Sequence, residues 1–323
     1  MGTEEIALRR WISKVISPGQ LGQLRAISMW RTLWAAFHIW SAIIAAFYLL
    51  EVSSQWGLWT RGLTCILCAV FIATRQNALA VQMHEGAHGL LFRSARLNDL
   101  FSNWLYAYWI LNRIEAYRVV HFKHHLHLHE NEDPDLKIYA YQFETRKSIS
   151  YALLKDLFLA TAIERMCTYW RYRSNDTSAA TLPKFVAFVW QLTPVLLLLA
   201  IYGDPIKGVS VYFLFWLLPL LTLYPIIVRI RTVAEHFTWT MPDNGKAAFV
   251  ARTTITGFFE RYFIGANMEY HFEHHLFPAI PHYNLRRFRK RLFEISGIDR
   301  EAKARQCHGY AKHLTSILFN KAK

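Results

Sequence analysis

Four long stretches of apolar residues constrain the fold of this chain more than any other feature of its sequence. They cover residues 34–50, 58–79, 186–202 and 209–228. A helix that crosses a bilayer needs roughly 20 mostly apolar residues, with a range of about 17–25, and all four stretches reach that length. Buried helices of a soluble protein are the alternative, but four such lengths favour membrane spans. We therefore expect an all-α membrane protein with four transmembrane helices in two hairpins.

Positive charge is concentrated outside these stretches. The 323 residues are 53% hydrophobic, yet the chain has a formal net charge of +14. Lysine and arginine recur in residues 1–31 and from residue 229 onward, whereas the two short connections, 51–57 and 203–208, contain only Lys207. Because such residues favour the cytoplasmic side of a membrane, we expect a multi-pass integral membrane protein whose two termini and long middle segment are cytoplasmic.

A basic run lies near the end of the chain: Arg286, Arg287, Arg289, Lys290 and Arg291. Such a run can bind nucleic acid. On a membrane protein it is better explained by contacts with anionic lipid headgroups or with an acidic partner. We expect membrane lipids and no nucleic acid among the partners.

The segments between the spans predict a helical cap. Residues 75–91 contain no proline, so the helix of the second span should continue and lift His84 clear of the bilayer. Residues 98–114 are aromatic but short, which predicts a re-entrant or interfacial helix. Residues 147–173 are amphipathic, which predicts a helix in the plane of the membrane surface. No further span is expected after residue 228.

Nine histidines in four clusters lie beside these segments. Within a helix, residues at i, i+3 and i+4 share a face and can hold one ligand together. The clusters are His84 and His88 in HEGAH; His121, His124 and His125 in HFKHH; His236 in RTVAEH; and His271, His274 and His275 in HFEHH.

Nine imidazoles exceed what one zinc ion uses, which is commonly four ligands. They fit two metal ions with four or five nitrogens each. Imidazole binds zinc, copper, iron and nickel alike, so the ligand type alone does not select the metal. A membrane enzyme that uses O2 would need a redox-active pair of metals with open positions, which favours iron. Carboxylates beside the clusters are candidates to accept the outward imidazole N–H groups: Glu85, Asp133, Asp135, Glu235, Glu269 and Glu273.

HEGAH, HFKHH followed by DPD, RTVAEH and HFEHH together resemble the histidine boxes of the membrane fatty acid desaturase family. The resemblance covers about residues 60–285, and it implies one domain over residues 1–323 with a core of about 30–290. It also implies two non-haem iron ions held by the nine histidines. The implied reaction uses O2 and two external electrons to introduce a double bond into a fatty acyl or other lipid chain. Hydroxylases and ketolases share these boxes and remain alternatives.

Two further expectations follow from the resemblance. Some relatives have a water-linked asparagine one turn before the lone histidine; here that position is Thr232, and Asn267 is a possible substitute for the tenth ligand. No cytochrome b5-like or rubredoxin-like module is visible, so the electrons should come from a separate carrier of the ferredoxin or cytochrome b5 type.

Other classes explain less of the sequence. HEGAH matches HExxH, in which Glu85 would be the general base of a membrane-embedded zinc protease, but that leaves seven histidines unexplained. A metal transporter should carry histidines within its spans, and only His38 lies in one. The remaining histidines are not expected to be ligands: His127, His129, His282, His308 and His313.

Overall fold

Three helical stretches in the computed structural model are long and apolar enough to cross a membrane, counting only residues 3–139, 146–164, 189–190, 192–237 and 250–319, which the structure describes. The first ends with α3 (Met29–Ser53), and the second is α4 (Leu58–Ala87). The third runs from Pro205 to His236 through α12 (Pro205–Tyr212), the π-helix η3 (Phe213–Leu217), α13 (Leu218–Leu221) and α14 (Leu223–His236).

The expected fourth span is seen only in part. Its described portion is α11 (Leu192–Tyr202), an apolar helix of 11 residues that turns back at Gly203 into α12. Residues 186–188 and 191 of that stretch lie outside the described residues. The described residues therefore contain three candidate spans, and the fourth stays a prediction.

Helix α4 connects the apolar part of the molecule to the cap. It continues for 30 residues without interruption, as the lack of proline predicts, and ends beside His88 where Gly89 adopts a φ of 72°. Nearly every residue from Ile72 to Ala87 is buried, because α3, α6 (Ile114–Leu126) and α14 pack around it. The HEGAH cluster therefore occupies the end of a rigid, enclosed helix.

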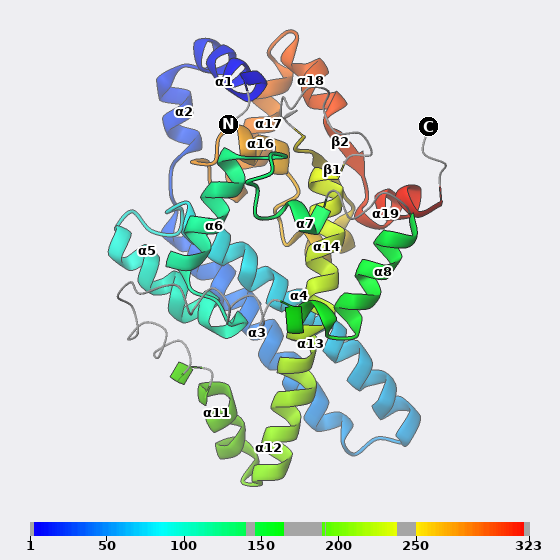
Figure 1. Cartoon of the computed structure of the whole chain (residues 1–323). Coiled ribbons are helices and arrows are strands. Elements are labelled where there is room, and N and C mark those ends of the chain that lie inside the picture. Colours follow the sequence, from blue (N-terminus) through cyan, green and yellow to red (C-terminus); the bar gives the residue numbers. More distant parts are fainter. Residues whose placement is uncertain (1–2, 140–145, 165–188, 191, 238–249, 320–323) are drawn as a thin grey trace.

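The remaining elements are short and gather around the end of α4 (Figure 1). They are α1 (Thr3–Val15), α2 (Pro18–Leu24), α5 (Ala95–Ser102), η1 (Asn103–Ala107), η2 (Tyr108–Ile110), α7 (Leu136–Tyr139), α8 (Arg146–Leu157), α15 (Phe258–Glu260), η5 (Arg261–Gly265), α16 (His271–Leu276), α17 (His282–Phe293), α18 (Ile298–Ala304) and α19 (Tyr310–Phe319). Figure 1 shows α1, α17 and α18 at the end of the molecule opposite the turn between α11 and α12.

Among the described residues, one short pair of strands interrupts the otherwise helical fold. Strand β1 (Thr253–Ile255) pairs in parallel with β2 (Gln306–His308), with Thr254 opposite Cys307. This two-stranded ladder ties the segment before α16 to the segment before α19. Three-residue strands have no clear alternating pattern, which is why the sequence did not predict them.

The two expected surface helices are irregular. In the segment 98–114, α5 continues directly into η1 and η2, and Leu111 then adopts a φ of 58°. In the segment 147–173, α8 ends at Leu157, a turn follows in which Leu159 has a φ of 65°, and residues 160–164 are again helical. Residues 165–173 are outside the described part of the chain, so the full extent of this helix stays a prediction.

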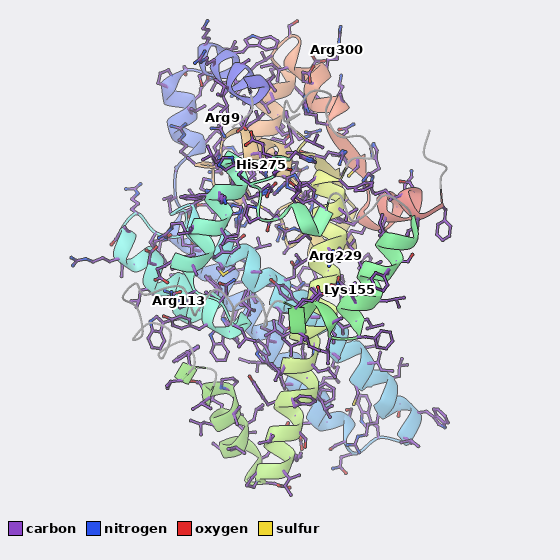
Figure 2. The ribbon with its side chains drawn as sticks, viewed as in Figure 1. Arg9, Arg113, Lys155, Arg229, His275 and Arg300 are labelled. Atoms are coloured by element: carbon purple, nitrogen blue, oxygen red, sulfur yellow. The ribbon has the colours of Figure 1, made fainter. Side chains whose placement is uncertain are left out.

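Two buried contacts hold the cap to the long helices. The ring centroids of Trp40 and Trp109 lie 4.5 Å apart, and Trp216 donates from Nε1 to the carbonyl of Trp109. On the other side, Arg229 of α14 forms a bidentate ion pair with Asp156 of α8, with N–O distances of 2.5 and 2.9 Å (Figure 2).

Candidate metal centre

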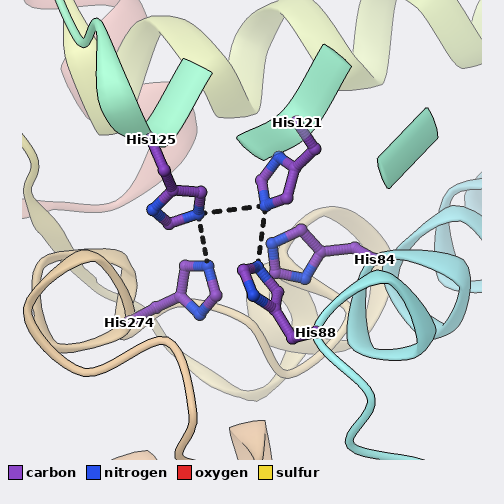
Figure 3. A group of neighbouring side chains, drawn as sticks. All are labelled: His84, His88, His121, His125 and His274. Atoms are coloured by element: carbon purple, nitrogen blue, oxygen red, sulfur yellow. Dashed lines mark hydrogen bonds between the residues drawn. The ribbon is translucent and has the colours of Figure 1, made fainter. Parts of the chain in front are cut away.

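The nine candidate histidines come together in space as two groups. The ligand nitrogens within each group lie within 4.8 Å of one another. The five-histidine group, drawn in Figure 3, contains His84, His88, His121, His125 and His274; the four-histidine group contains His124, His236, His271 and His275.

The two HxxHH motifs divide between the groups in opposite ways. On α6, His121 and His125 join the five-histidine group while His124 joins the other. On α16, the pair one turn apart, His271 and His275, joins the four-histidine group, and His274 crosses to the five-histidine group. In each motif the i, i+4 pair stays together, because those positions lie one above the other on a helix. The middle histidine points to the neighbouring group.

The spacing of the ring nitrogens fits bound metal ions. In the five-histidine group, Nε2 of His121 lies 2.9 Å from Nε2 of His88 and 3.0 Å from Nε2 of His125. In the other group, Nε2 of His271 lies 2.8 Å from Nε2 of His236 and 3.1 Å from Nε2 of His275. Nitrogens bound about 2.0–2.1 Å from a metal and at right angles to each other lie about 2.9 Å apart.

His84 gives a second reason to place a cation here. It is 3% exposed, and neither of its ring nitrogens has a hydrogen-bond partner among the described residues. Leaving a buried polar group unpaired is costly, so such groups are rare in stable proteins. A metal ion among the converging nitrogens would satisfy His84, and the residues present therefore fit a two-metal centre.

Burial keeps most of these imidazoles in the neutral form that binds metal. It lowers the pKa of His88 to about 4, against smaller opposing effects. Burial is also the first cause of a lowered pKa at five others: His121, His125, His271, His274 and His275.

His124 differs because it contacts carboxylates. Burial lowers its pKa, but the hydrogen bond to Asp133 and the charges of Asp135 and Asp133 raise it above the ordinary value overall. Nδ1 of His124 lies 2.9 Å from Oδ1 of Asp133, and the carboxyl also accepts hydrogen bonds from the hydroxyl of Tyr139 and the backbone N–H of His129. A carboxylate on Nδ1 directs Nε2 toward the metal position.

His236 is oriented by the backbone instead. Its Nδ1 lies 2.9 Å from the carbonyl oxygen of Val250, and its own carbonyl lies 3.0 Å from Nε2 of His129. His129, only 2% exposed, is thus a buried support of the lone histidine. Neither Val250 nor the carbonyl of His236 could be recognised from the sequence, because backbone acceptors leave no residue-type signal.

The other candidate carboxylates lie close to the groups but have different partners. Glu235 is 3.0 Å from Arg231 and 3.7 Å from Nε2 of His271. Asp135 is 3.8 Å from Nδ1 of His124. Glu269 pairs with Arg261, and Glu273 pairs with Arg289 and accepts from Thr253. The contacts of Glu269 and Glu273 therefore connect the segment around α16 to neighbouring elements.

The structure does not bring Asn267 to the histidines. Its side chain is exposed, its φ is 66°, and it lines a cavity that none of the nine histidines lines. Thr232 lines a cavity that borders the histidines, but its hydroxyl donates to the carbonyl of Val228. No tenth ligand is apparent among the described residues.

A cavity of about 1070 Å³ opens directly onto both histidine groups. His84 and His121 line it from one group, and His124, His236 and His271 from the other. Its remaining walls mix apolar residues such as Val119 and Val228 with charged ones such as Arg231 and Asp135. The wall of this cavity is therefore amphiphilic.

Comparison with known proteins decides the family. The fatty acid desaturase family matches this chain over residues 57–300, a segment that includes all nine histidines of both groups. The chain belongs to the fatty acid desaturase family. The long apolar helices and the expected order of the histidine boxes agree with this membership, which supports a desaturase-type oxidoreductase.

A curated desaturase is also similar over most of its length. This chain is 27% identical over 297 residues to the dihydrorhizobitoxine desaturase of Bradyrhizobium elkanii. The match covers 89% of this chain and 80% of that protein.

Family membership and geometry together argue against the zinc protease alternative. A general base must reach a metal-bound water, but Oε2 of Glu85 accepts from the backbone N–H of His282 at 2.9 Å and lies 3.0 Å from its Nδ1. Glu85 is 1% exposed. The carboxylate of Glu85 therefore joins α4 to the start of α17.

Proposed function

We propose that this protein is an O2-dependent, non-haem di-iron membrane enzyme that introduces a double bond into a fatty acyl or other lipid chain. The observation that carries the proposal is the division of nine histidines, most of them buried, into two adjacent groups within a chain of the desaturase family. The five-histidine group would hold one iron ion and the four-histidine group the other.

The chemistry that two bound iron ions supply is the reduction of O2 to two waters, using two external electrons and two protons together with two hydrogen atoms from adjacent carbons of the substrate. A separate ferredoxin or cytochrome b5-type protein would deliver the electrons. The exposed basic side chains of α17, including Arg287 and Lys290, offer a surface for an acidic carrier.

The residues of the chain prepare the site. Asp133 and the Val250 carbonyl hold Nδ1 of His124 and His236, so that Nε2 of each ring faces the metal position. The cavity beside both groups would position the substrate, with Val119 and Val228 against its carbon chain. Burial of the histidines excludes bulk water from the reacting carbons.

Two measurements test this function. Metal analysis of the purified protein should give about two iron atoms per chain, and one stoichiometric zinc ion would instead support a hydrolase.

Cells that express the wild-type protein should contain a new double bond that is absent with His124→Ala and present with His308→Ala, which changes an exposed histidine outside both groups. A new hydroxyl group in place of the double bond would show that the reaction is a hydroxylation and not a desaturation. Because the similar Bradyrhizobium protein is named for dihydrorhizobitoxine, that compound belongs in the substrate panel beside acyl lipids.

A further inference from the structure

A second cavity, of about 800 Å³, lies on the opposite face of α4 from the histidines. Arg75, Ala78 and Gln82 face it from α4, whereas Asn77 and His84 of the same helix face the histidine cavity. The start of α3, η5 and the first turn of α17 supply its other walls. Because the two cavities share no lining residue, this cavity is not part of the proposed catalytic site.

Positive charge dominates the second cavity. Four arginines line it, Arg31, Arg75, Arg261 and Arg286, against one carboxylate, Glu269. Nε of Arg261 lies 2.7 Å from Oε1 of Glu269. This carboxylate therefore does not balance the charges of the other three guanidinium groups. An occupant should therefore carry negative charge.

Arg75 is the most constrained of these cations. It is 2% exposed, donates to the carbonyl of Tyr262 at 2.5 Å, and lies 3.9 Å from the centroid of that ring. Within the described part of the chain, no carboxylate oxygen approaches it within 4.0 Å. A buried guanidinium without a counter-charge is unfavourable, and an anion in the cavity would supply one.

Gln82 provides an independent indication of a polar ligand. Its side chain is 4% exposed and lines the cavity one turn beyond Ala78. It makes no side-chain hydrogen bond to any residue that the structure describes. Because Gln82 lines the cavity, its amide is positioned to donate to a ligand there.

The position of the cavity identifies the source of that group. Arg75 lies 17 residues after the start of α4, which is about 26 Å at 1.5 Å per residue, near the edge of a hydrocarbon core about 30 Å thick. Trp30, Trp34 and Tyr283 line the cavity, and tryptophan and tyrosine concentrate at the headgroup level. Beside it, Phe37 and Phe258 are 63% and 72% exposed, as lipid-facing side chains would be.

We propose that this cavity binds the phosphate of an anionic glycerophospholipid. Arginine forks bind phosphate oxygens bidentately, and the unpaired Gln82 amide donates a further hydrogen bond. The acyl chains of the lipid run along the exposed apolar side chains of α3. Basic pockets between membrane helices bind such headgroups for the same reasons.

The test measures lipid binding to the full-length protein in neutral detergent, with phosphatidylglycerol, phosphatidylcholine and inorganic phosphate as separate ligands. Wild-type protein should bind phosphatidylglycerol in preference to phosphatidylcholine. Arg286→Glu should weaken this binding roughly tenfold or more, because a charged hydrogen bond is replaced by a repulsion. Gln82→Leu, which leaves the net charge unchanged, should weaken it by a smaller but measurable factor.

The matched control is Arg287→Glu, an exposed neighbour that does not line the cavity. It should bind the lipid as the wild-type protein does. Equal losses in the Arg286 and Arg287 variants would mean general surface attraction and would overturn the proposal. So would an unchanged affinity in Gln82→Leu, or binding of inorganic phosphate as tight as that of the lipid. Iron content serves as the folding control for each variant.

Discussion

The imidazoles of His125 and His275 stack with their ring centroids 4.2 Å apart and their planes inclined by 28°. His125 belongs to the five-histidine group and His275 to the four-histidine group. This contact between α6 and α16 brings the two groups side by side. In the proposed function the two metal positions would therefore lie side by side, and a change in one group should affect the other.

Asp133 should be required for full metal affinity although it is not a ligand in our proposal. Asp133→Asn weakens the acceptor that orients His124, and loss of such support typically lowers metal affinity or activity about 10–100-fold. Iron titration and turnover would measure the effect. Glu130→Gln is the control, because the carboxylate of Glu130 pairs with His127, which lies outside both groups. Equal effects of the two changes would argue against the assigned role of Asp133.

The metal-free protein should lose stability as the pH falls from about 6.5 toward 4. Burial lowers the pKa of His88 to about 4 and lowers those of His121, His125 and His274. Below their unfolded-state pKa of about 6.5, the unfolded chain therefore binds more protons than the folded one, and stability decreases with decreasing pH. The raised pKa of His124 changes stability in the opposite direction, but the four lowered pKa values together have the larger effect.

Thermal unfolding of the metal-free protein between pH 7.5 and 4.5 measures this dependence. Iron-loaded protein should resist acid until protons displace the metal. A melting temperature of the metal-free protein that stays constant across this range would contradict the proposed neutral, buried state of the imidazoles.

The ion pair between Arg229 and Asp156 should be costly to break on one side only. Arg229→Met leaves a carboxylate buried without its partner, which typically costs about 3–5 kcal/mol. Adding Asp156→Leu removes the stranded charge and should restore much of the lost stability. Chemical unfolding of the single and double variants in detergent distinguishes this account from a simple packing defect, in which the two losses would add.

Gly86, between Glu85 and His88 in HEGAH, should not tolerate a side chain. A Cβ at this position would lie 2.0 Å from Oγ and 2.8 Å from Cβ of Ser102, which is fully buried on α5. Gly86→Ala should therefore destabilise the protein by about 1–3 kcal/mol and lower its iron content. Combining it with Ser102→Gly should restore both; failure of the combination would place the cause elsewhere.

Much of this arrangement could be predicted from the sequence because it depends on local patterns. Apolar length predicted the three candidate spans that the described residues contain, and the absence of proline predicted that α4 continues to Ala87, next to His88. The division of each HxxHH motif could not be predicted, because spacing fixes which residues share a helix face but not where the facing helix lies. The partners of Glu273 and the position of Asn267 away from the histidines depend in the same way on packing between distant segments.

The opposite division of the two HxxHH motifs has a consequence for how the protein matures. Each histidine group draws ligands from both α6 and α16, whose sequences are separated by about half the chain. Neither group can be completed by the first part of the chain alone. In the proposed function, the nascent protein would therefore have no finished site for either iron ion until α16 has emerged and docked.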